Sequence, residues 1–171
     1  MRRTHSRGSR VNTTRPVADT MSDLPGDAMI PADQPPRYIL DEQVGFLLRQ
    51  VNQRHTTIFA EHMIDGLTPT QWAALAKLEE KGSLSQNHLG RLTAMDAATI
   101  KGVVDRLTAR GLTTAEPDPE DGRRLNITLT EGGRALVARA AENAFAITEE
   151  TLSPLSSAER QTLLRLLEKL K

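Results

Sequence analysis

One short segment has a hydrophobic pattern that differs from the rest of the chain. Residues 125–129 alternate apolar with polar side chains, which is typical of a half-buried β-strand. Residues 112–116 form a second candidate strand, and the segment 117–122 between them is dense in proline, aspartate and glycine, the residues that favour turns. Apolar residues elsewhere recur every three or four positions. The sequence therefore predicts a mainly helical fold with a small β-hairpin wing.

A long amphipathic helix is expected over residues 39–65. Its apolar positions follow the i, i+3, i+4, i+7 spacing of a helix with one buried side, and His55 falls on the same stripe. Gly66 follows as a stop signal. A helix this long in a small domain is typical of an assembly element.

Two short helices separated by a brief turn are expected upstream of the hairpin. The first begins at Ser85, and the second begins at Asp96 with small and polar residues in its first turn. A helix-turn-helix followed directly by a hairpin that carries Arg123 and Arg124 predicts a winged helix-turn-helix over residues 68–130.

The last part of the chain is expected to form an interface together with the first helix. A helix capped by Thr130 runs to around Leu152, and Pro154 breaks it. The final helix carries more apolar surface than a solitary terminal helix should expose. Its leucines are Leu163, Leu164, Leu166, Leu167 and Leu170. We therefore expect dimerisation helices within 39–65 and 145–171, with packing on their own chain as the alternative.

The charges are distributed unevenly although the formal net charge is zero. Residues 1–18 contain five arginines and no acidic residue, so the remainder carries a net charge of −5. Residues 1–37 are rich in proline and small polar residues, which predicts a disordered basic tail ahead of one domain over 38–171. The tail is either an arm that contacts phosphates or a dispensable extension, with translation beginning at Met21 or Met29 as one form of the second alternative.

The composition excludes several classes of protein. The chain has no cysteine, which excludes disulfides, cysteine-based zinc fingers, iron–sulfur clusters and thiol redox sensing. No apolar run approaches the roughly 18 residues of a membrane-spanning helix. The arginine-rich start lacks the apolar stretch of a secretory signal. We expect a cytoplasmic protein with no membrane partner and no cofactor.

Three motifs carry a family resemblance. They read VVDRLTARGL over residues 103–112, DPEDGRR over 118–124 and LTEGG over 129–133. With these motifs the chain resembles the MarR family of winged-helix transcriptional regulators, and the flanking helices extend the likeness to residues 38–171. The resemblance implies a homodimer on a pseudo-palindromic double-stranded DNA operator, usually a repressor that a small ligand releases.

The helix that begins at Asp96 is expected to lie in the major groove, with its first turns at the base edges. Small side chains there allow a close approach; they are Ala97, Ala98 and Thr99. Lys101 and Arg106 are expected to neutralise phosphates, although an ion pair with Asp105 is the alternative for Arg106. Gln86 and Asn87 are further candidates for contacts with the DNA backbone.

The hairpin turn carries the remaining residues expected at DNA. By the resemblance, Arg123 enters the minor groove and Asp121 holds it in place, and a narrow groove concentrates the negative potential that favours such an arginine. Arg124 is expected to meet phosphate or solvent. The alternative for Arg123 is a solvated hairpin tip.

Family members that bind aromatic acids hold them between the long helices and the winged helix. The residues expected to line such a pocket here are Arg49, Arg54, His55, Phe59 and Trp72. An arginine pairs with a carboxylate through two N–H groups, and an indole offers a stacking face; ordinary core or surface roles are the alternative. Over residues 40–49 and 90–102 the sequence is similar to repressors of aromatic-acid catabolism, including nicotinate regulators that respond to 6-hydroxynicotinate.

Other functions are weaker alternatives. His55 and His62 lie seven residues apart beside Glu61, but no cluster of ligands has the spacing of a metal site, so a metal-responsive regulator is less favoured. The acidic cluster at 118–121 lies on a turn beside arginines, a poor place for acid–base catalysis, so we do not expect an enzyme. An architectural DNA-binding protein and an activating regulator stay open.

Overall fold

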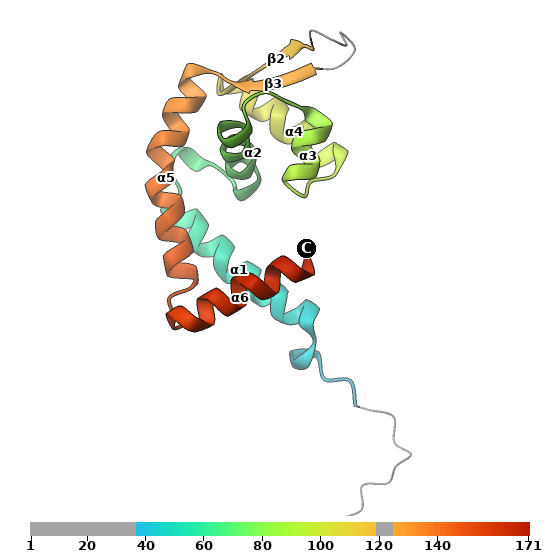
Figure 1. Ribbon diagram of the computed structural model, residues 1–171, viewed down its shortest axis with the longest axis vertical. Helices are drawn as coiled ribbons and strands as arrows, with labels where there is room; N and C mark the ends of the chain where they lie inside the picture. Colours follow the sequence, from blue (N-terminus) through green and yellow to red (C-terminus); the bar gives the residue numbers. More distant parts are fainter. Residues whose placement is uncertain (1–36, 119–124) are drawn as a thin grey trace, which may run out of the picture. The chain divides into compact units, whose positions relative to one another are not determined.

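Most of the chain is helical, with one small sheet, in the computed structural model, which describes residues 37–118 and 125–171 (Figure 1). The elements are η1 (Leu40–Glu42), α1 (Val44–His62), η2 (Ile64–Gly66), α2 (Pro69–Lys81), β1 (Leu84–Ser85), α3 (Gln86–Leu92), α4 (Ala97–Ala109), β2 (Thr113–Pro117), β3 (Leu125–Leu129), α5 (Glu131–Thr151) and α6 (Ser157–Leu170). The predicted fold class is confirmed. Among the described residues, no helix has the length and apolar character that crossing a membrane requires.

Five helices begin at a residue whose side chain caps the helix, and three of these residues, Ser85, Asp96 and Thr130, are the predicted starts. Thr68 and Ser156 form the capping boxes that open α2 and α6. The side chains of Ser85, Asp96 and Thr130 accept hydrogen bonds from backbone N–H groups in the first turns of α3, α4 and α5. These caps fix the residue at which each helix starts, and therefore the side of α3 and α4 that faces solvent.

The first long helix is shorter than the predicted 39–65. It begins only after Gln43, which is extended and whose side-chain amide donates to Ile39 O at 2.8 Å, so that the preceding residues form the 3-10 turn η1. It ends at His62, because the next residue, Met63, is again extended and carries a buried side chain. Gly66 therefore lies within η2 and does not terminate α1.

The hairpin belongs to a three-stranded sheet with the order β1-β3-β2. Strands β2 and β3 are antiparallel, with Ala115 opposite Ile127, and Leu84 of β1 lies opposite the same residue on the other side. A two-residue strand is too short to show a period of two, which is why the sequence pattern missed β1. Because β1 leads directly into α3, the sheet fixes the hairpin to the helix-turn-helix.

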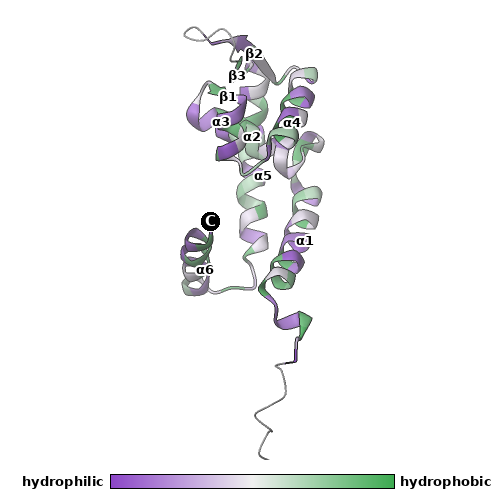
Figure 2. Ribbon diagram, turned by 90° about the vertical axis from the view of Figure 1, so that its right-hand side faces the viewer, coloured by the Kyte–Doolittle hydropathy of each residue, from purple (hydrophilic) through white to green (hydrophobic). Residues whose placement is uncertain are grey.

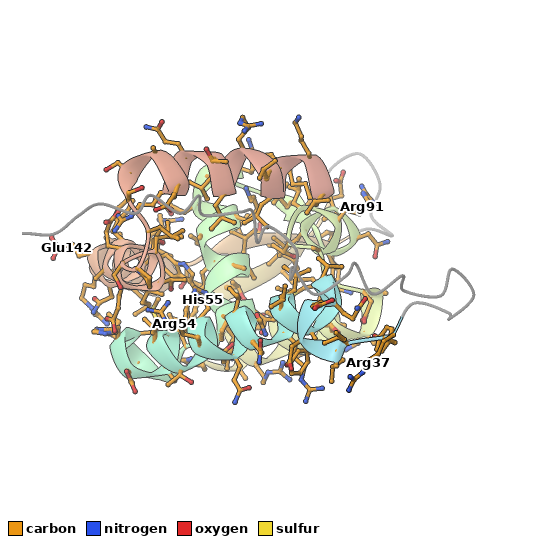
Figure 3. The ribbon with its side chains drawn as sticks, turned by 90° about the horizontal axis from the view of Figure 1, so that it is seen from below. Arg37, Arg54, His55, Arg91 and Glu142 are labelled. Carbon is orange, nitrogen blue, oxygen red and sulfur yellow. The ribbon has the colours of Figure 1, made fainter. Side chains whose placement is uncertain are left out.

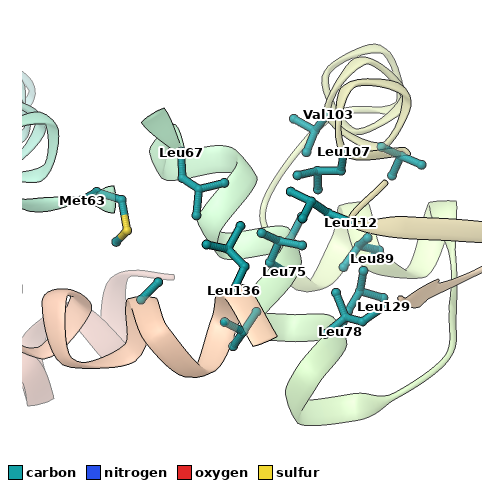
Figure 4. Close-up of a cluster of buried hydrophobic side chains, with 14 of the residues drawn as sticks. Met63, Leu67, Leu75, Leu78, Leu89, Val103, Leu107, Leu112, Leu129 and Leu136 are labelled. Carbon is teal, nitrogen blue, oxygen red and sulfur yellow. The ribbon is translucent and has the colours of Figure 1, made fainter. Parts of the chain in front are cut away.

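The core of the winged helix lies where α2, α3, α4 and the sheet meet (Figure 4). Leu89 of α3 and Leu107 of α4 are fully buried there. Gly90 lets the two helices approach closely, since a Cβ at this position would lie 3.1 Å from both Ile100 Cγ2 and Met95 O. This packing holds α4 firmly against α3 and leaves its other side in solvent.

The start of α5 packs against the main chain that leaves α4. A Cβ on Gly133 would lie 2.1 Å from Leu112 O, which accepts a hydrogen bond from Thr130 N at 3.1 Å. The Thr130 hydroxyl donates to Gly111 O at 2.7 Å. The neighbouring Gly132 has open surroundings, with nothing closer than 3.7 Å to an added Cβ. Position 133 therefore requires glycine.

Candidate nucleic-acid interface

The first turn of α4 presents small, exposed side chains. Asp96 caps the helix, and its Oδ1 accepts a hydrogen bond from Thr99 N at 2.7 Å. The backbone amide of Thr99, and after it the Thr99 side chain, lower the pKa of the Asp96 carboxyl below its ordinary value. Ala97, Ala98 and Thr99 are all exposed beyond this cap. The end of α4 can therefore approach another surface without obstruction by long side chains.

Two cations follow along the exposed side of α4. Lys101 Nζ lies 2.7 Å from Asp105 Oδ2, one helical turn further on. Arg106 lies back over its own helix, since a Cβ on Gly102 would be 3.3 Å from Arg106 Nη1. Asp105 thus pairs with Lys101 rather than with Arg106. An exposed pair of this kind contributes little to stability, so Lys101 can exchange Asp105 for a phosphate at small cost.

The start of α3 adds polar side chains beside β1. Ser85 Oγ accepts a hydrogen bond from His88 N at 3.4 Å. Gln86 is half-buried, whereas Asn87 and His88 are exposed. Of the two residues of α3 that we expect at DNA, Asn87 is therefore the more accessible.

The base of the hairpin is held by a side-chain hydrogen bond. Asn126 of β3 donates from Nδ2 to Asp118 Oδ2 at 2.9 Å. Asp121, Arg123 and Arg124 lie outside the described residues, so their contacts with DNA stay predictions.

A polar cluster, which we name the Asp65 cluster, links the end of α4 to α5. It consists of Asp65, Arg110 and Arg139. Arg110, the C-cap residue directly after α4, donates from Nη2 to Asp65 O at 2.9 Å. The Asp65 Oδ2 atom lies 2.6 Å from Arg139 Nη2 on α5. No sequence pattern relates residues separated by 45 and 74 positions, so sequence reasoning missed this cluster.

Two of the residues expected to bind an effector, Arg54 and His55, belong to α1 and contact the end of α5 (Figure 3). Arg54 donates to the carbonyl oxygens of Thr151 and Glu150, at 2.6 and 3.0 Å. His55 Nδ1 lies 2.9 Å from the Thr151 hydroxyl. Arg54 therefore satisfies Thr151 O at the end of α5 and adds a second donor to Glu150 O, which already accepts a hydrogen bond from Ser153 N at 3.2 Å.

The other three expected effector residues have different surroundings. Phe59 is 4% exposed in the core, Trp72 is half-buried against it, and Arg49 is exposed on α1. Arg54 lines a cavity of about 640 Å³ between α1, the end of α5 and α6, and its walls include neither His55, Phe59 nor Trp72. The structure does not gather the five residues around this cavity.

The histidines that raised the alternative of a metal site have other partners. His62 Nε2 lies 2.6 Å from Glu150 Oε2, and His55 faces Thr151. Within residues 37–118 and 125–171 there is no group of three or more His, Cys, Asp or Glu side chains that could hold a metal ion.

The helices α1 and α6 leave many apolar side chains in solvent. No residue of α6 is buried, and Leu164 and Leu170 are 53% and 74% exposed. The exposed apolar residues of α1 are Val44, Leu47, Leu48 and Val51. Figure 2 shows α6 apart from α1 and α5, and the cavity of about 640 Å³ lies between them. An exposed apolar surface of this kind is typical of a protein–protein interface.

Known proteins match both the sequence and the fold. Residues 65–124 match the MarR family. The transcriptional repressor NicR of Pseudomonas putida is 43% identical over 141 residues, which covers 82% of this chain and 89% of NicR. The structure of a probable transcriptional regulator from Pseudomonas aeruginosa is 54% identical with a TM-score of 0.76, over 78% of this chain and 100% of that one.

A second solved structure is that of BpsR from Bordetella bronchiseptica, whose DNA binding is regulated by 6-hydroxynicotinic acid. It is 41% identical, with a TM-score of 0.76, and the match covers 78% of this chain and 96% of BpsR. These matches confirm what the three motifs indicate: the chain belongs to the MarR family of transcriptional regulators.

Proposed function

We propose that the protein is a ligand-responsive repressor that binds a pseudo-palindromic DNA operator as a homodimer. The observation that carries this proposal is the first turn of α4, which exposes Ala97, Ala98 and Thr99 on a capped helix held by α3. A recognition helix reads base edges in the major groove with its N-terminal residues. The repressor NicR supports repression as the direction of control.

Each part of the interface has a role in this proposal. Ala98 and the methyl group of Thr99 contact thymine methyl groups. Arg123, held by Asp121, enters the minor groove. The contacts to phosphates and sugars come from Gln86, Asn87, Lys101, Arg106 and Arg124. Lys101, Arg106 and Arg124 belong to residues 19–171, whose net charge is negative. The position of these three cations, and not the total charge of the chain, therefore determines DNA binding.

The homodimer is supported by the exposed apolar surface of α1 and α6. One winged helix covers only a short piece of DNA, and two copies on a two-fold operator double the contacts. The proposal includes a cytoplasmic location and the absence of enzymatic activity, in agreement with relatives that are transcriptional regulators.

The effector that we propose is a small aromatic acid, with 6-hydroxynicotinate as the first candidate. The regulation of BpsR by this acid supports the choice. Arg54 is the proposed partner of the carboxylate, because it is the one of the five expected residues that lines the cavity beside α6, and the roles of Arg49, His55, Phe59 and Trp72 stay predictions. Since Arg54 already holds the end of α5, an acid that takes its guanidinium would release two carbonyl groups of α5.

We expect 6-hydroxynicotinate to raise the melting temperature of the protein and to release it from operator DNA. A ligand at about 100 times its Kd stabilises the native state by about 2.7 kcal/mol when it binds only that state. Thermal shift and fluorescence anisotropy measure the two effects, with 2-hydroxypyridine as the control that lacks the carboxylate. An unchanged melt together with unchanged DNA binding contradicts the assignment of this acid.

The DNA-binding proposal is tested with Arg123→Ala. We expect the affinity for DNA from the protein's own promoter region to fall at least about tenfold, because a groove-reading arginine is lost. Arg165→Ala, which removes one exposed charge from α6, is the matched control and should keep its affinity. Anisotropy titrations at fixed salt against promoter and random DNA give the affinities, and size-exclusion chromatography gives the oligomeric state. Affinity near that of the wild type for Arg123→Ala would overturn the assignment.

A further inference from the structure

The linker between α1 and α2 is bonded to two other elements. On one side Asp65 O accepts the hydrogen bond from Arg110 at the end of α4, at 2.9 Å. On the other side the Asp65 carboxylate pairs with Arg139 of α5 at 2.6 Å. One turn further along α5, Asn143 Nδ2 donates to His62 O at 2.9 Å. Asp65 of the linker therefore joins α4 to α5, and His62 at the end of α1 adds a further contact with α5.

The backbone conformation of Asp65 makes both contacts available. Its φ of 54° and ψ of 23° lie in the left-handed region, which aspartate enters more readily than most residues. The buried side chains of Met63 and Leu67 hold the chain on either side. Between these anchors the carbonyl of Asp65 meets α4 while its carboxylate meets α5.

The ion pair of the Asp65 cluster is exposed. The side chains of Arg139 and Asp65 are 62% and 46% exposed, and pairs of this kind add little to the stability of a protein. What the pair does restrain is the direction in which α4 extends from α5, because the same residue contacts both helices.

We propose that Asp65 is a positioning residue that fixes the orientation of α4 relative to α5. The consequence for DNA rests on the proposed function. In the proposed dimer α5 leads into the dimerisation helix α6, so the angle between α4 and α5 sets the separation of the two recognition helices. That separation determines which half-site spacing the dimer accepts.

The first test measures the orientation without DNA. The chain has no cysteine, so nitroxide labels at Ala98→Cys on α4 and Ala146→Cys on α5 report one distance by pulsed electron paramagnetic resonance. An excess of unlabelled protein makes each labelled chain pair with an unlabelled one in the dimer, so the measured distance is between two labels of the same chain. We expect a narrow distance distribution in the otherwise wild-type chain and a broader one with Asp65→Asn or Arg139→Gln.

The matched control is Glu149→Gln. It removes another exposed ion pair of α5, the one with Arg160, which does not reach α4. The control distribution should stay narrow, and all variants should melt within about 3 °C of the wild type. Unchanged widths in both Asp65→Asn and Arg139→Gln overturn the proposal whether or not the protein binds DNA. If Asp65→Asn does not fold, Arg139→Gln alone decides.

The second test asks whether the orientation matters for DNA. Operators whose half-sites are moved apart by one or two base pairs should bind the wild type less tightly than the native operator. For Arg139→Gln this discrimination should fall at least about threefold. A broadened distribution with unchanged discrimination overturns the link to spacing. If the wild-type protein does not bind DNA from its promoter region, the proposed function is contradicted. The distances measured without DNA still test the role of Asp65 in that case.

Discussion

Gly133→Ala is expected to lower the free energy of unfolding by about 2–3 kcal/mol. The added Cβ would lie 2.1 Å from Leu112 O, and this oxygen belongs to a main chain that also accepts from Thr130 N. A backbone carbonyl cannot rotate away as a side chain can, so α5 and the chain that leaves α4 must move apart. The gain of about 1 kcal/mol from alanine in a helix offsets only part of this cost.

Thermal melting followed by circular dichroism measures the effect, and the Tm should fall by about 5–10 °C. Gly132→Ala is the matched control, one residue earlier in the same helix, where the nearest atom to an added Cβ is 3.7 Å away. This variant should melt at or above the temperature of the wild type. Equal melting temperatures for the two variants would show that the approach of α5 to Leu112 does not constrain the fold.

Leu164→Glu is expected to convert the proposed dimer into monomers. Leu164 lies on α6 near Leu48 of α1, where both line a cavity of about 660 Å³. An unpaired carboxylate inside an apolar interface costs several kcal/mol, and a two-fold dimer contains the change twice. The affinity for the operator should then fall by about 100-fold or more, because separate monomers no longer hold both half-sites together.

Analytical ultracentrifugation gives the oligomeric state, and anisotropy gives the operator affinity. Gln161→Glu adds the same negative charge at an exposed polar position of α6 and should leave the dimer intact. A dimeric Leu164→Glu variant with the operator affinity of the wild type would place the interface elsewhere. In that case the leucines of α6 would serve their own chain.

Local signals made much of this fold predictable. Ser85, Asp96 and Thr130 are capping residue types directly before apolar periodicity, and each one begins a helix. The alternation in residues 125–129 predicts β3 with its observed bounds. In contrast, β1 contains only two residues and depends on its pairing with β3, and the start of α1 depends on a hydrogen bond to Ile39. Such contacts produce no periodic pattern of apolar residues in the sequence.

The candidate site divides in the same way. The small residues at the start of α4 follow from the position of one cap, so their exposure could be predicted. The partner of Arg54 could not, because it is a pair of backbone carbonyls about 97 residues away and any helix end offers the same groups. The role of Asp65 could not be predicted either, since its two partners belong to separate parts of the chain, at the end of α4 and on α5. Sequence patterns identify what a helix presents to solvent, but not which distant polar group meets it.

Because α6 has no buried side chains in a single chain, its stability depends on the concentration of the protein. A helix of 14 residues is only marginally stable alone in water, so in the proposed dimer a second copy supplies most of the order of α6. Association depends on concentration by mass action. A cell with few copies would therefore hold chains that are more open to proteolysis than those in a cell with many. At a low concentration of chains, proteolysis of monomers would lower the amount of active repressor further. When more chains are synthesised, the concentration of the dimer would rise more steeply than the total concentration of chains.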